Sequence, residues 1–179
     1  MDDLRFRHAK PADIPALVAL VTSAYRGEES RRGWTTEADL LDGPRIDPQV
    51  LQADIERPRS TVIVAERGDG LLACVHVADE HGAGYLGMFS VRPGAQGGGV
   101  GSALMREAER HAREDLGLPM MRMTVIDVRD ELIAYYERRG YARTGIKKPF
   151  PYGYSRFGIP RREDLRFEVL EKPLTGEAA

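Results

Sequence analysis

The stretch that decides the fold is residues 89–102, which read FSVRPGAQGGGVGS. Its first residues predict the end of a strand, and Pro93 then turns the chain. Several glycines follow, and residues 99–114 have the apolar periodicity of a helix. The first amides of a helix have no partner inside it and carry partial positive charge, and glycines leave those amides accessible. A strand, a glycine-rich turn and a helix in this order therefore predict an anion site suited to a pyrophosphate.

Two common nucleotide-binding motifs do not fit this loop. A Walker A loop requires Gly-Lys-Ser/Thr, whereas Gly101 is followed by Ser102 and Ala103. A dinucleotide fingerprint requires the spacing G-x-G-x-x-G, but the third glycine position after Gly99 and Gly101 holds Leu104. A nucleotide-binding protein is therefore disfavoured.

Two blocks of the sequence carry a family resemblance. Gln96-x-x-Gly99-x-Gly101 matches the Q/R-x-x-G-x-G/A loop of the GNAT (GCN5-related) N-acetyltransferases, between residues that resemble that family's fourth strand and following helix. Residues 131–141 resemble its segment in which a helix carrying a tyrosine ends in Gly-aromatic. The resemblance extends over residues 4–172 as an architecture, but the motifs are specific only at 85–106 and 131–141.

The resemblance implies acetyl-CoA as co-substrate and no metal. Main-chain groups of residues 89–91 would pair with the pantetheine arm, and amides of residues 97–102 would hold the pyrophosphate. An amide near Phe89 could also polarise the thioester carbonyl. The expected coenzyme-binding residues are Phe89, Ser90, Val91, Gln96, Gly97, Gly98, Gly99, Val100, Gly101, Ser102 and Arg129.

Tyr136 takes the position of the family's catalytic tyrosine. When an amine attacks a thioester, the sulfur leaves as a thiolate that must be protonated, and a phenol held nearby is a suitable donor. Spacing alone favours a core position for Tyr136 beside Leu132 and Ile133. The resemblance favours the role of general acid, with Tyr135 as the weaker candidate.

Arg129 marks a departure from the family pattern. The family usually has an asparagine seven residues before the tyrosine, where it binds the pantetheine amides. Arginine cannot accept hydrogen bonds, so Arg129 cannot replace both functions of that asparagine. It could bind phosphate or carbonyl groups of the coenzyme, or pair with Asp127 or Glu131.

The general base has several candidates. Many family members carry a carboxylate on the fourth strand, but residues 85–89 contain none. The segment after the first helix, which covers the acceptor pocket in the family, offers Glu28, Glu29 and Glu37, and we predict Glu37 as the base. His76, on the strand beside the coenzyme strand, is a second candidate that also suits a structural role. The aromatic-rich segment 148–160 could line the acceptor site or merely cover the core.

Composition and periodicity predict the rest of the fold. The 179 residues form one expected domain, with 42% hydrophobic residues and a net charge of −2, which argues against general nucleic-acid binding. Strands are predicted at 4–8, 60–65, 71–77, 85–91, 121–125, 141–146 and 166–170. Helices are predicted from residue 13 to 25, at 36–41, 47–56, 99–114 and 131–139. The 26–59 segment would be an acceptor-side arm, and residues 171–179 a frayed tail.

The expected fold class is α/β (α+β mixed): a central mixed, mostly antiparallel sheet of six to seven strands with helices on both faces. The predicted function is direct transfer of an acetyl group from acetyl-CoA to a primary amine of a small molecule. The alternative is a non-catalytic acyl-CoA sensor or interaction module. No nucleic-acid or membrane partner is expected, Cys74 is expected to be buried, and the N-terminus lacks a signal peptide, which favours the cytoplasm. Many family members are dimers, so the resemblance allows a homodimer.

Overall fold

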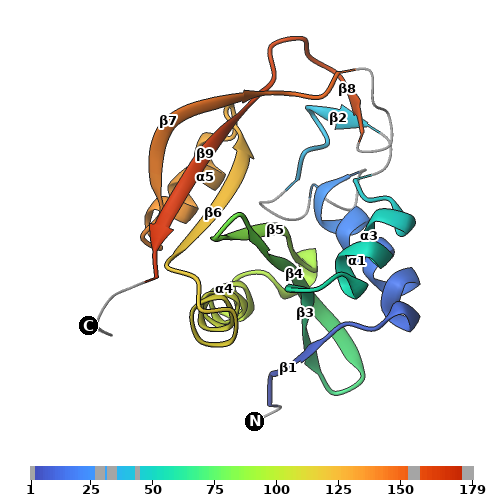
Figure 1. The fold of residues 1–179 in the computed structure, drawn as a ribbon. Helices are drawn as coiled ribbons and strands as arrows, with labels where there is room; N and C mark the ends of the chain where they lie inside the picture. Colours follow the sequence, from blue (N-terminus) through green and yellow to red (C-terminus); the bar gives the residue numbers. More distant parts are fainter. Residues whose placement is uncertain (1–2, 27–30, 32–35, 43–44, 153–157, 175–179) are drawn as a thin grey trace.

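The computed structural model describes residues 3–26, 31, 36–42, 45–152 and 158–174. They form a seven-stranded sheet in the order β1-β3-β4-β5-β6-β9-β7 and a two-stranded sheet of β2 and β8 (Figure 1). The strands are β1 (Arg5–His8), β2 (Leu41–Asp42), β3 (Ser60–Arg67), β4 (Gly70–Glu80), β5 (Ala83–Val91), β6 (Met120–Ile126), β7 (Ala142–Pro149), β8 (Ile159–Pro160) and β9 (Arg166–Pro173). In the large sheet, only β5 and β6 run parallel. The predicted mixed, mostly antiparallel sheet is confirmed.

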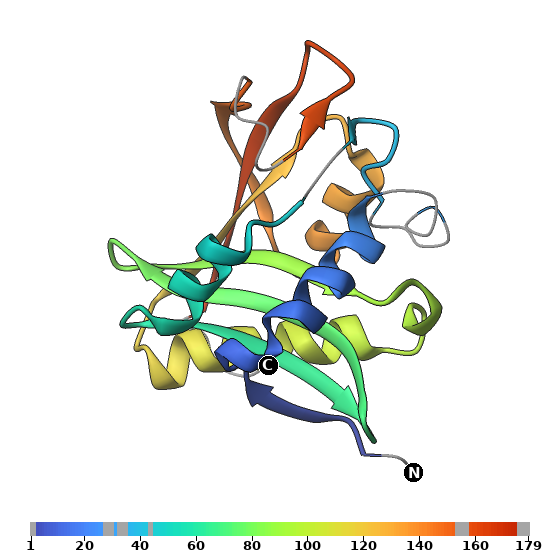
Figure 2. The same ribbon diagram turned by 90° about the vertical axis from the view of Figure 1, so that its right-hand side faces the viewer.

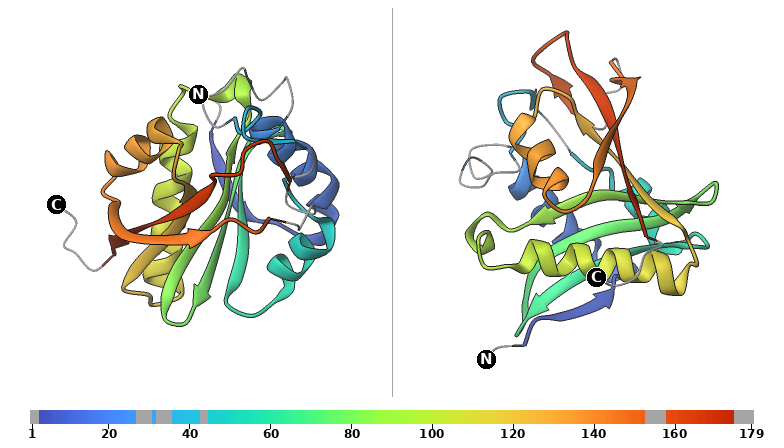
Figure 3. Two further views of the ribbon diagram at one scale, coloured as in Figure 1. Left: turned by 90° about the horizontal axis from the view of Figure 1, so that it is seen from above. Right: turned by 90° about the vertical axis from the view of Figure 1, so that its left-hand side faces the viewer.

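Helices cover both faces of the large sheet (Figures 2 and 3). On one face lie α1 (Ile14–Tyr25) and α3 (Pro48–Glu56), and on the other lie α4 (Val100–Arg110) and α5 (Asp130–Glu137). Each layer has its own apolar core, one around α1 and the other around α4 and α5. Because both faces are covered, the inner part of β3 is a continuous buried run, residues 61–65.

Local sequence explains where these helices begin and what they bury. The apolar periodicity predicted from residue 13 to 25 places Leu17 and Val21 of α1 against the sheet, and Leu20 is buried beside them. The α3 helix begins at Pro48, and the Asp47 side chain accepts a hydrogen bond from the Gln49 amide at 2.8 Å. This combination of an N-cap carboxylate and a proline in the first turn is the expected helix start. Cys74 is fully buried in the α1 core, as predicted.

Several predicted element boundaries are wrong. No helix forms at 36–41, because residues 38–40 make a turn and Leu41–Asp42 pairs with Ile159–Pro160 as a strand. The last predicted strand continues to Pro173. Residues 171–173, which were expected to belong to a frayed tail, are therefore paired with β6 in the sheet. Residues 147–149 also belong to a strand, β7, rather than to a connection. In each case pairing with a distant strand decides the conformation.

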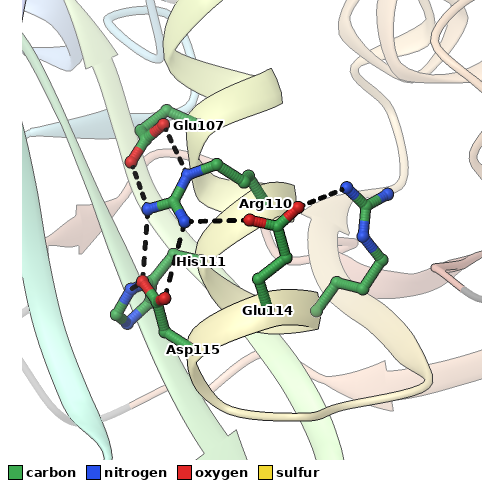
Figure 4. Close-up of polar contacts among 6 residues, drawn as sticks. Glu107, Arg110, His111, Glu114 and Asp115 are labelled. Atoms are coloured by element: carbon green, nitrogen blue, oxygen red, sulfur yellow. Dashed lines mark hydrogen bonds and ion pairs between the residues drawn. The ribbon is translucent and has the colours of Figure 1, made fainter.

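The end of α4 is held by a cluster of charged side chains (Figure 4). Arg110 bonds to Glu107 at 2.7 Å, to Glu114 at 3.2 Å and to Asp115 at 3.2 Å. His111 lies 2.8 Å from the same Asp115 carboxylate. The helix passes here into one wide turn, His111–Asp115, with i→i+5 bonding. These ion pairs are largely exposed, so each contributes little on its own.

Two further findings concern the described part of the chain. None of its helices is long and apolar enough to cross a membrane. It also contains no group of three or more His, Cys, Asp or Glu side chains arranged to hold a metal ion.

His76 is a buried histidine in β4. Its Nε2 lies 2.8 Å from the Ser60 hydroxyl, its Nδ1 lies 3.7 Å from an Asp54 carboxylate oxygen, and its ring packs edge-on against Tyr85. Burial, together with the nearby Arg57 charge, lowers the pKa of His76 from 6.5 to about 4. The imidazole is therefore neutral in the folded protein at neutral pH.

This shift predicts an acid-sensitive contribution to stability. The unfolded chain takes up a proton near pH 6.5 and the folded chain only near pH 4, so the stabilisation present above pH 6.5 is lost as the pH falls toward 4. His76→Gln keeps a polar contact to Ser60 but does not titrate. Between about pH 7 and pH 4.5 we therefore expect this variant to lose about 2 kcal/mol less of its unfolding free energy than the wild type loses. Urea unfolding at the two pH values measures this, and equal losses in both proteins would contradict it.

Candidate active site

The candidate site begins where β5 and β6 part. The two strands pair only at Gly84 with Met121 and at Tyr85 with Arg122, and then diverge (Figures 1 and 2). A Cβ on Gly84 would lie 3.0 Å from the Met121 sulfur, so a glycine permits this close approach. Beyond it lies a cavity of about 360 Å³ between the strands, which we call the acceptor-side cavity. Its lining includes Tyr25, Glu37, Arg45, Tyr85, Phe89, Met123, Val125, Arg129, Leu132, Tyr136, Phe150 and Phe167.

Strand β5 is distorted beside this cavity. The register with β4 shifts between Cys74 and His76, and Met88 adopts a left-handed φ of 55°. The Met88 carbonyl accepts hydrogen bonds from the Ser90 hydroxyl at 3.0 Å and from the Cys74 thiol at 3.8 Å. A left-handed non-glycine residue costs on the order of 1 kcal/mol, so these contacts hold a bulge that the chain would not adopt alone. The bulge turns the backbone of β5 at the edge that faces the gap.

Tyr136 lies on α5 and lines the acceptor-side cavity. Its side chain is only 4% exposed and packs edge-on against Phe89 and Tyr141. Burial raises the pKa of the Tyr136 hydroxyl well above 10. The phenol therefore keeps its proton at the wall of the cavity.

Glu37 lines the same cavity and is 5% exposed. Its Oε1 atom lies 3.1 Å from Nη1 of Arg26 and 3.4 Å from Nε of Arg45. Its amide donates to the Tyr25 carbonyl at 2.7 Å, which anchors the turn to the end of α1. The carboxylate is thus buried with two guanidinium partners, as a buried charge requires.

Arg129 and Arg45 border the cavity beside Tyr25. Their guanidinium carbons lie 5.8 Å and 4.9 Å from the centre of the Tyr25 ring. Arg129 also donates to the Thr36 carbonyl at 3.3 Å. The Tyr25 hydroxyl donates to the Phe89 carbonyl, so α1 is tied directly to the bulged strand. Arg129 thus connects the cavity lining to the segment before β2.

The glycine-rich loop borders a second cavity, of about 630 Å³, which we call the loop cavity. Gly97 and Gly99 have φ values of 90° and 81°, which glycine adopts without strain. The first backbone bond of α4 runs from the Ala103 amide to the Gly99 carbonyl, so the amides at 100–102 precede the helical hydrogen bonds. A Cβ on Gly101 would lie 3.1 Å from the Tyr135 hydroxyl, so this glycine keeps the cavity open. The loop has the form that its sequence predicted.

Basic side chains surround the loop cavity and the one beside it. Arg138 and Arg139 line both, and Arg106 and Lys172 line a neighbouring cavity of about 480 Å³. Arg139 is held rigidly, with its guanidinium 3.3 Å from the centre of the Tyr135 ring and an Nη2 bond of 2.9 Å to the Ser102 hydroxyl. Glu131 and Glu109 are the described carboxylates in the lining. This end of the site therefore suits a polyanion.

The structure divides the predicted residues into three groups. Tyr136, Glu37, Arg129 and Phe89 line the acceptor-side cavity, whereas Val91, Gln96, Gly97, Gly99, Gly101 and Ser102 line the loop cavity. Ser90, Gly98 and Val100 line neither, because Ser90 and Val100 are buried and Gly98 faces outward. The alternative base His76 also lies outside both linings, and Glu28 and Glu29 lie outside the described residues.

Sequence reasoning missed Tyr25 and Arg45. The sequence gives Tyr25 only as the last residue of the helix predicted from residue 13 to 25, and this position at the helix end is the available signal. Arg45 lies in a turn before α3, where no motif distinguishes one arginine from another. The sequence allowed two roles for segment 148–160: lining the acceptor site or covering the core. Phe150 of this segment does both, because it lines the cavity and packs against Phe167.

Comparison with known proteins identifies the class. Residues 21–141 match the acetyltransferase (GNAT) family, which is more than half of the chain. The chain therefore belongs to the GNAT acetyltransferase family.

One curated relative is the mycothiol acetyltransferase of Streptomyces avermitilis. It is 33% identical over 147 residues, which cover 79% of this chain and 44% of the relative. The chain thus spans less than half the length of that protein.

Solved structures share the whole architecture. An N-acetyltransferase from Staphylococcus aureus Mu50 superposes with a TM-score of 0.73 at 10% identity, covering 97% of this chain and 99% of that one. A ribosomal-protein-alanine N-acetyltransferase from Brucella melitensis superposes with a TM-score of 0.70 at 21% identity, covering 94% of this chain and 99% of that one. A putative acetyltransferase from Salmonella typhimurium, solved with its cofactor acetyl-CoA, superposes with a TM-score of 0.69 at 18% identity, covering 98% of this chain and 96% of that one. At these identities the likeness shows the GNAT fold.

The loop cavity yields a test by substitution. Gly101→Val would place branched carbons against Tyr135 and Phe89, so we expect the dissociation constant for coenzyme A to rise by about tenfold or more. Gly94→Val is the matched control, because Gly94 is in the same loop but a Cβ there meets nothing within 4 Å. Calorimetric titration of both variants measures the effect. Equal affinities would show that the coenzyme does not occupy this cavity.

Proposed function

We propose that the protein transfers an acetyl group from acetyl-CoA to a primary amine of a small molecule, directly and in a ternary complex. The observation that carries the proposal is the alignment of two cavities along β5 and α5. Leu132 and Tyr136 of α5 line the acceptor-side cavity, and Ala134 and Tyr135 line the loop cavity. One extended molecule can therefore lie along both elements, with its anionic end at the loop and its reactive end beside Tyr136. The name of the Streptomyces relative supports acetyl transfer as the reaction.

The residues present fit coenzyme A. The loop supplies accessible amides and open space at Gly101, and Arg138 and Arg139 supply positive charge for phosphate groups. Beyond Tyr85 the edge of β5 that faces β6 is released from strand pairing, so it is available to the amide groups of a pantetheine arm. The Phe89 carbonyl already accepts from Tyr25, so the arm would pair with the remaining groups of this segment.

When bound, acetyl-CoA supplies the acetyl group: a carbon–nitrogen bond forms to the amine and the carbon–sulfur bond breaks. Tyr136 gives its proton to the departing sulfur and recovers one from the amine nitrogen. The raised pKa of Tyr136 keeps the phenol protonated until that moment. Arg45 and Arg129 oppose this shift and favour negative charge at the hydroxyl. One proton is released overall, because the ammonium loses two protons and the sulfur gains one.

Glu37 is the proposed contact for the incoming amine. It is a carboxylate in the lining of the acceptor-side cavity, and it stands in for the carboxylate that β5 lacks. We assign it to hold the ammonium group and to accept the first proton before passing it to solvent. Arg129 is assigned to the carbonyl groups of the pantetheine arm, to which a guanidinium can donate.

A non-catalytic acyl-CoA sensor is the second candidate. It is favoured by the two guanidinium partners of Glu37, which occupy Oε1 of the one carboxylate in the described lining of the acceptor-side cavity. The buried Tyr136 hydroxyl favours the enzyme, because coenzyme binding alone does not require a proton donor in the cavity.

Removal of the phenol hydroxyl tests the proposed mechanism. We expect Tyr136→Phe to lower the turnover number by about a hundredfold or more while coenzyme A affinity stays within about twofold, since general acid catalysis contributes about 10²–10⁴-fold. The measurement is thiol release from acetyl-CoA in the presence of a panel of primary amines. Tyr141→Phe is the matched control, because the buried Tyr141 hydroxyl has no hydrogen-bond partner among the described residues and lies outside all three cavity linings. Unchanged turnover in Tyr136→Phe would exclude the assigned role, and coenzyme binding without turnover on any amine would favour the sensor.

The pKa of Tyr136 also predicts the alkaline side of the pH profile. Because the folded pKa is raised well above 10, the phenol stays protonated as the pH rises through the ordinary tyrosine range. We therefore expect the turnover number at saturating amine not to fall between about pH 8 and pH 9.5. A descending limb in that interval that is absent from Tyr136→Phe would assign the tyrosine a lower pKa and contradict the burial argument.

A further inference from the structure

A second feature of the acceptor-side cavity is the pairing of opposite charges in its wall. The Nε atom of Arg45 lies 3.4 Å from the Oε1 atom of Glu37, and both side chains line the cavity. Arg26 approaches the same Oε1 atom at 3.1 Å. Both of these contacts use the Oε1 atom of Glu37, and the contact of Arg45 is made through Nε. The second carboxylate oxygen of Glu37 and the forked Nη groups of Arg45 are the atoms that we assign to a ligand.

Packing holds both groups in place. The Arg45 guanidinium lies over the Tyr25 ring at 4.9 Å, and Tyr25 is itself bonded to the Phe89 carbonyl. Glu37 is fixed by Arg26 and by its amide bond to the Tyr25 carbonyl. Such preorganised groups lose little conformational freedom when a ligand binds, so they discriminate well between ligands. The pair is therefore built as a receptor for charge rather than as an exposed surface ion pair.

The arrangement is complementary to a zwitterion. An α-amino acid carries an ammonium and a carboxylate on the same carbon, so its two charges lie about as close together as those of Glu37 and Arg45. A guanidinium fork matches the geometry of a carboxylate, which it binds with two parallel hydrogen bonds. A carboxylate oxygen accepts from an ammonium.

The charge balance disfavours a polycation. The described lining contains two guanidinium groups, Arg45 and Arg129, and a single carboxylate, Glu37. Each additional positive charge on an acceptor would meet repulsion in a cavity of low dielectric. A polyamine is therefore a poor match, whereas an acceptor with a carboxylate beside its amine gains a partner for Arg45.

The remaining wall is apolar. Met123, Val125, Leu132, Phe150 and Phe167 line it, and the whole cavity has about 360 Å³, part of which the acetyl end of the coenzyme would occupy. This space suits an apolar side chain of moderate size.

We propose that the acceptor is a free α-amino acid with an apolar side chain, its ammonium held by Glu37 and its carboxylate by Arg45. The proposal rests on the acetyltransferase function proposed above and names the substrate class of the same site. Arg45 becomes the residue that determines acceptor specificity.

The experiment compares matched acceptors. Thiol release from acetyl-CoA is measured with L-leucine, L-methionine and L-phenylalanine, with their carboxamides, and with spermidine. For the wild type we expect kcat/KM for at least one acid to exceed that of its carboxamide by about tenfold or more, since the amide loses the charge-assisted pair. In Arg45→Gln we expect this ratio to fall to about threefold or less. The fall should come from a lower kcat/KM for the acid, while kcat/KM for the carboxamide stays unchanged. Arg113→Gln removes the same charge from the exposed wide turn that follows α4, outside the cavity lining, and should keep the wild-type ratio.

The outcomes separate the two proposals. If carboxamides or spermidine are acetylated as well as the acids, the amino-acid assignment is wrong while the acetyltransferase function stands. If the protein binds coenzyme A but no amine releases thiol, the proposed function fails.

A measurement without turnover covers the case in which Arg45→Gln is inactive. In the presence of coenzyme A, the preferred acid should raise the melting temperature of the wild type and of Arg113→Gln but not that of Arg45→Gln. Coenzyme A alone should stabilise all three, which controls for folding. An equal shift by the acid in Arg45→Gln would overturn the assignment.

Discussion

The parting of β5 from β6 is the constraint on which the rest of the structure depends. A parallel pair that continued past Tyr85 and Arg122 would fill its own hydrogen bonds and leave no opening in the sheet. Because β6 instead stays paired with β9 along its full length, the two halves of the sheet diverge. The Met88 bulge and the bond from Tyr25 to Phe89 then hold the free edge of β5 at the opening. The cavity therefore results from strand pairing elsewhere in the sheet.

Burial gives the side chains at this opening their chemical character. Tyr136 is enclosed by aromatic rings, so its hydroxyl is a poor proton donor to water and becomes useful only when a strong base forms inside the cavity. The charged groups of the wall stabilise one another, because burying an unpaired charge would cost several kcal/mol of solvation free energy. Glu37 has two arginine partners, and Arg45 rests on Tyr25. The wall thus combines fixed charge with low dielectric, the conditions under which a site discriminates between acceptors by charge.

Much of the architecture was predictable, because it depends on local pattern. Apolar periodicity located α1 and α4, a β-branched run located β3, and the glycines beside them helped to place β4 and the end of α5. The predictions failed where the partner is distant: residues 36–41 resemble a helix in isolation but include β2, which pairs with β8 more than a hundred residues later. The same limit applied to the tail, which β6 draws into the sheet as the end of β9. Long-range pairing overrides local propensity in these segments.

The candidate site shows the same difference between features that depend on neighbouring residues and features that depend on distant ones. The sequence by itself determined the glycine-rich loop, since its conformation depends on Gly97 and Gly99 and on the helix that follows. The resemblance of residues 131–141 to the family's tyrosine segment indicated Tyr136. Only the tertiary structure decided that Tyr25, Glu37 and Arg45 share one cavity wall with that tyrosine, although about ninety residues or more separate them from it along the chain. The physical reason is that a loop needs only neighbouring residues to set its backbone angles. A charged wall requires groups from separate elements to be brought together and desolvated by packing.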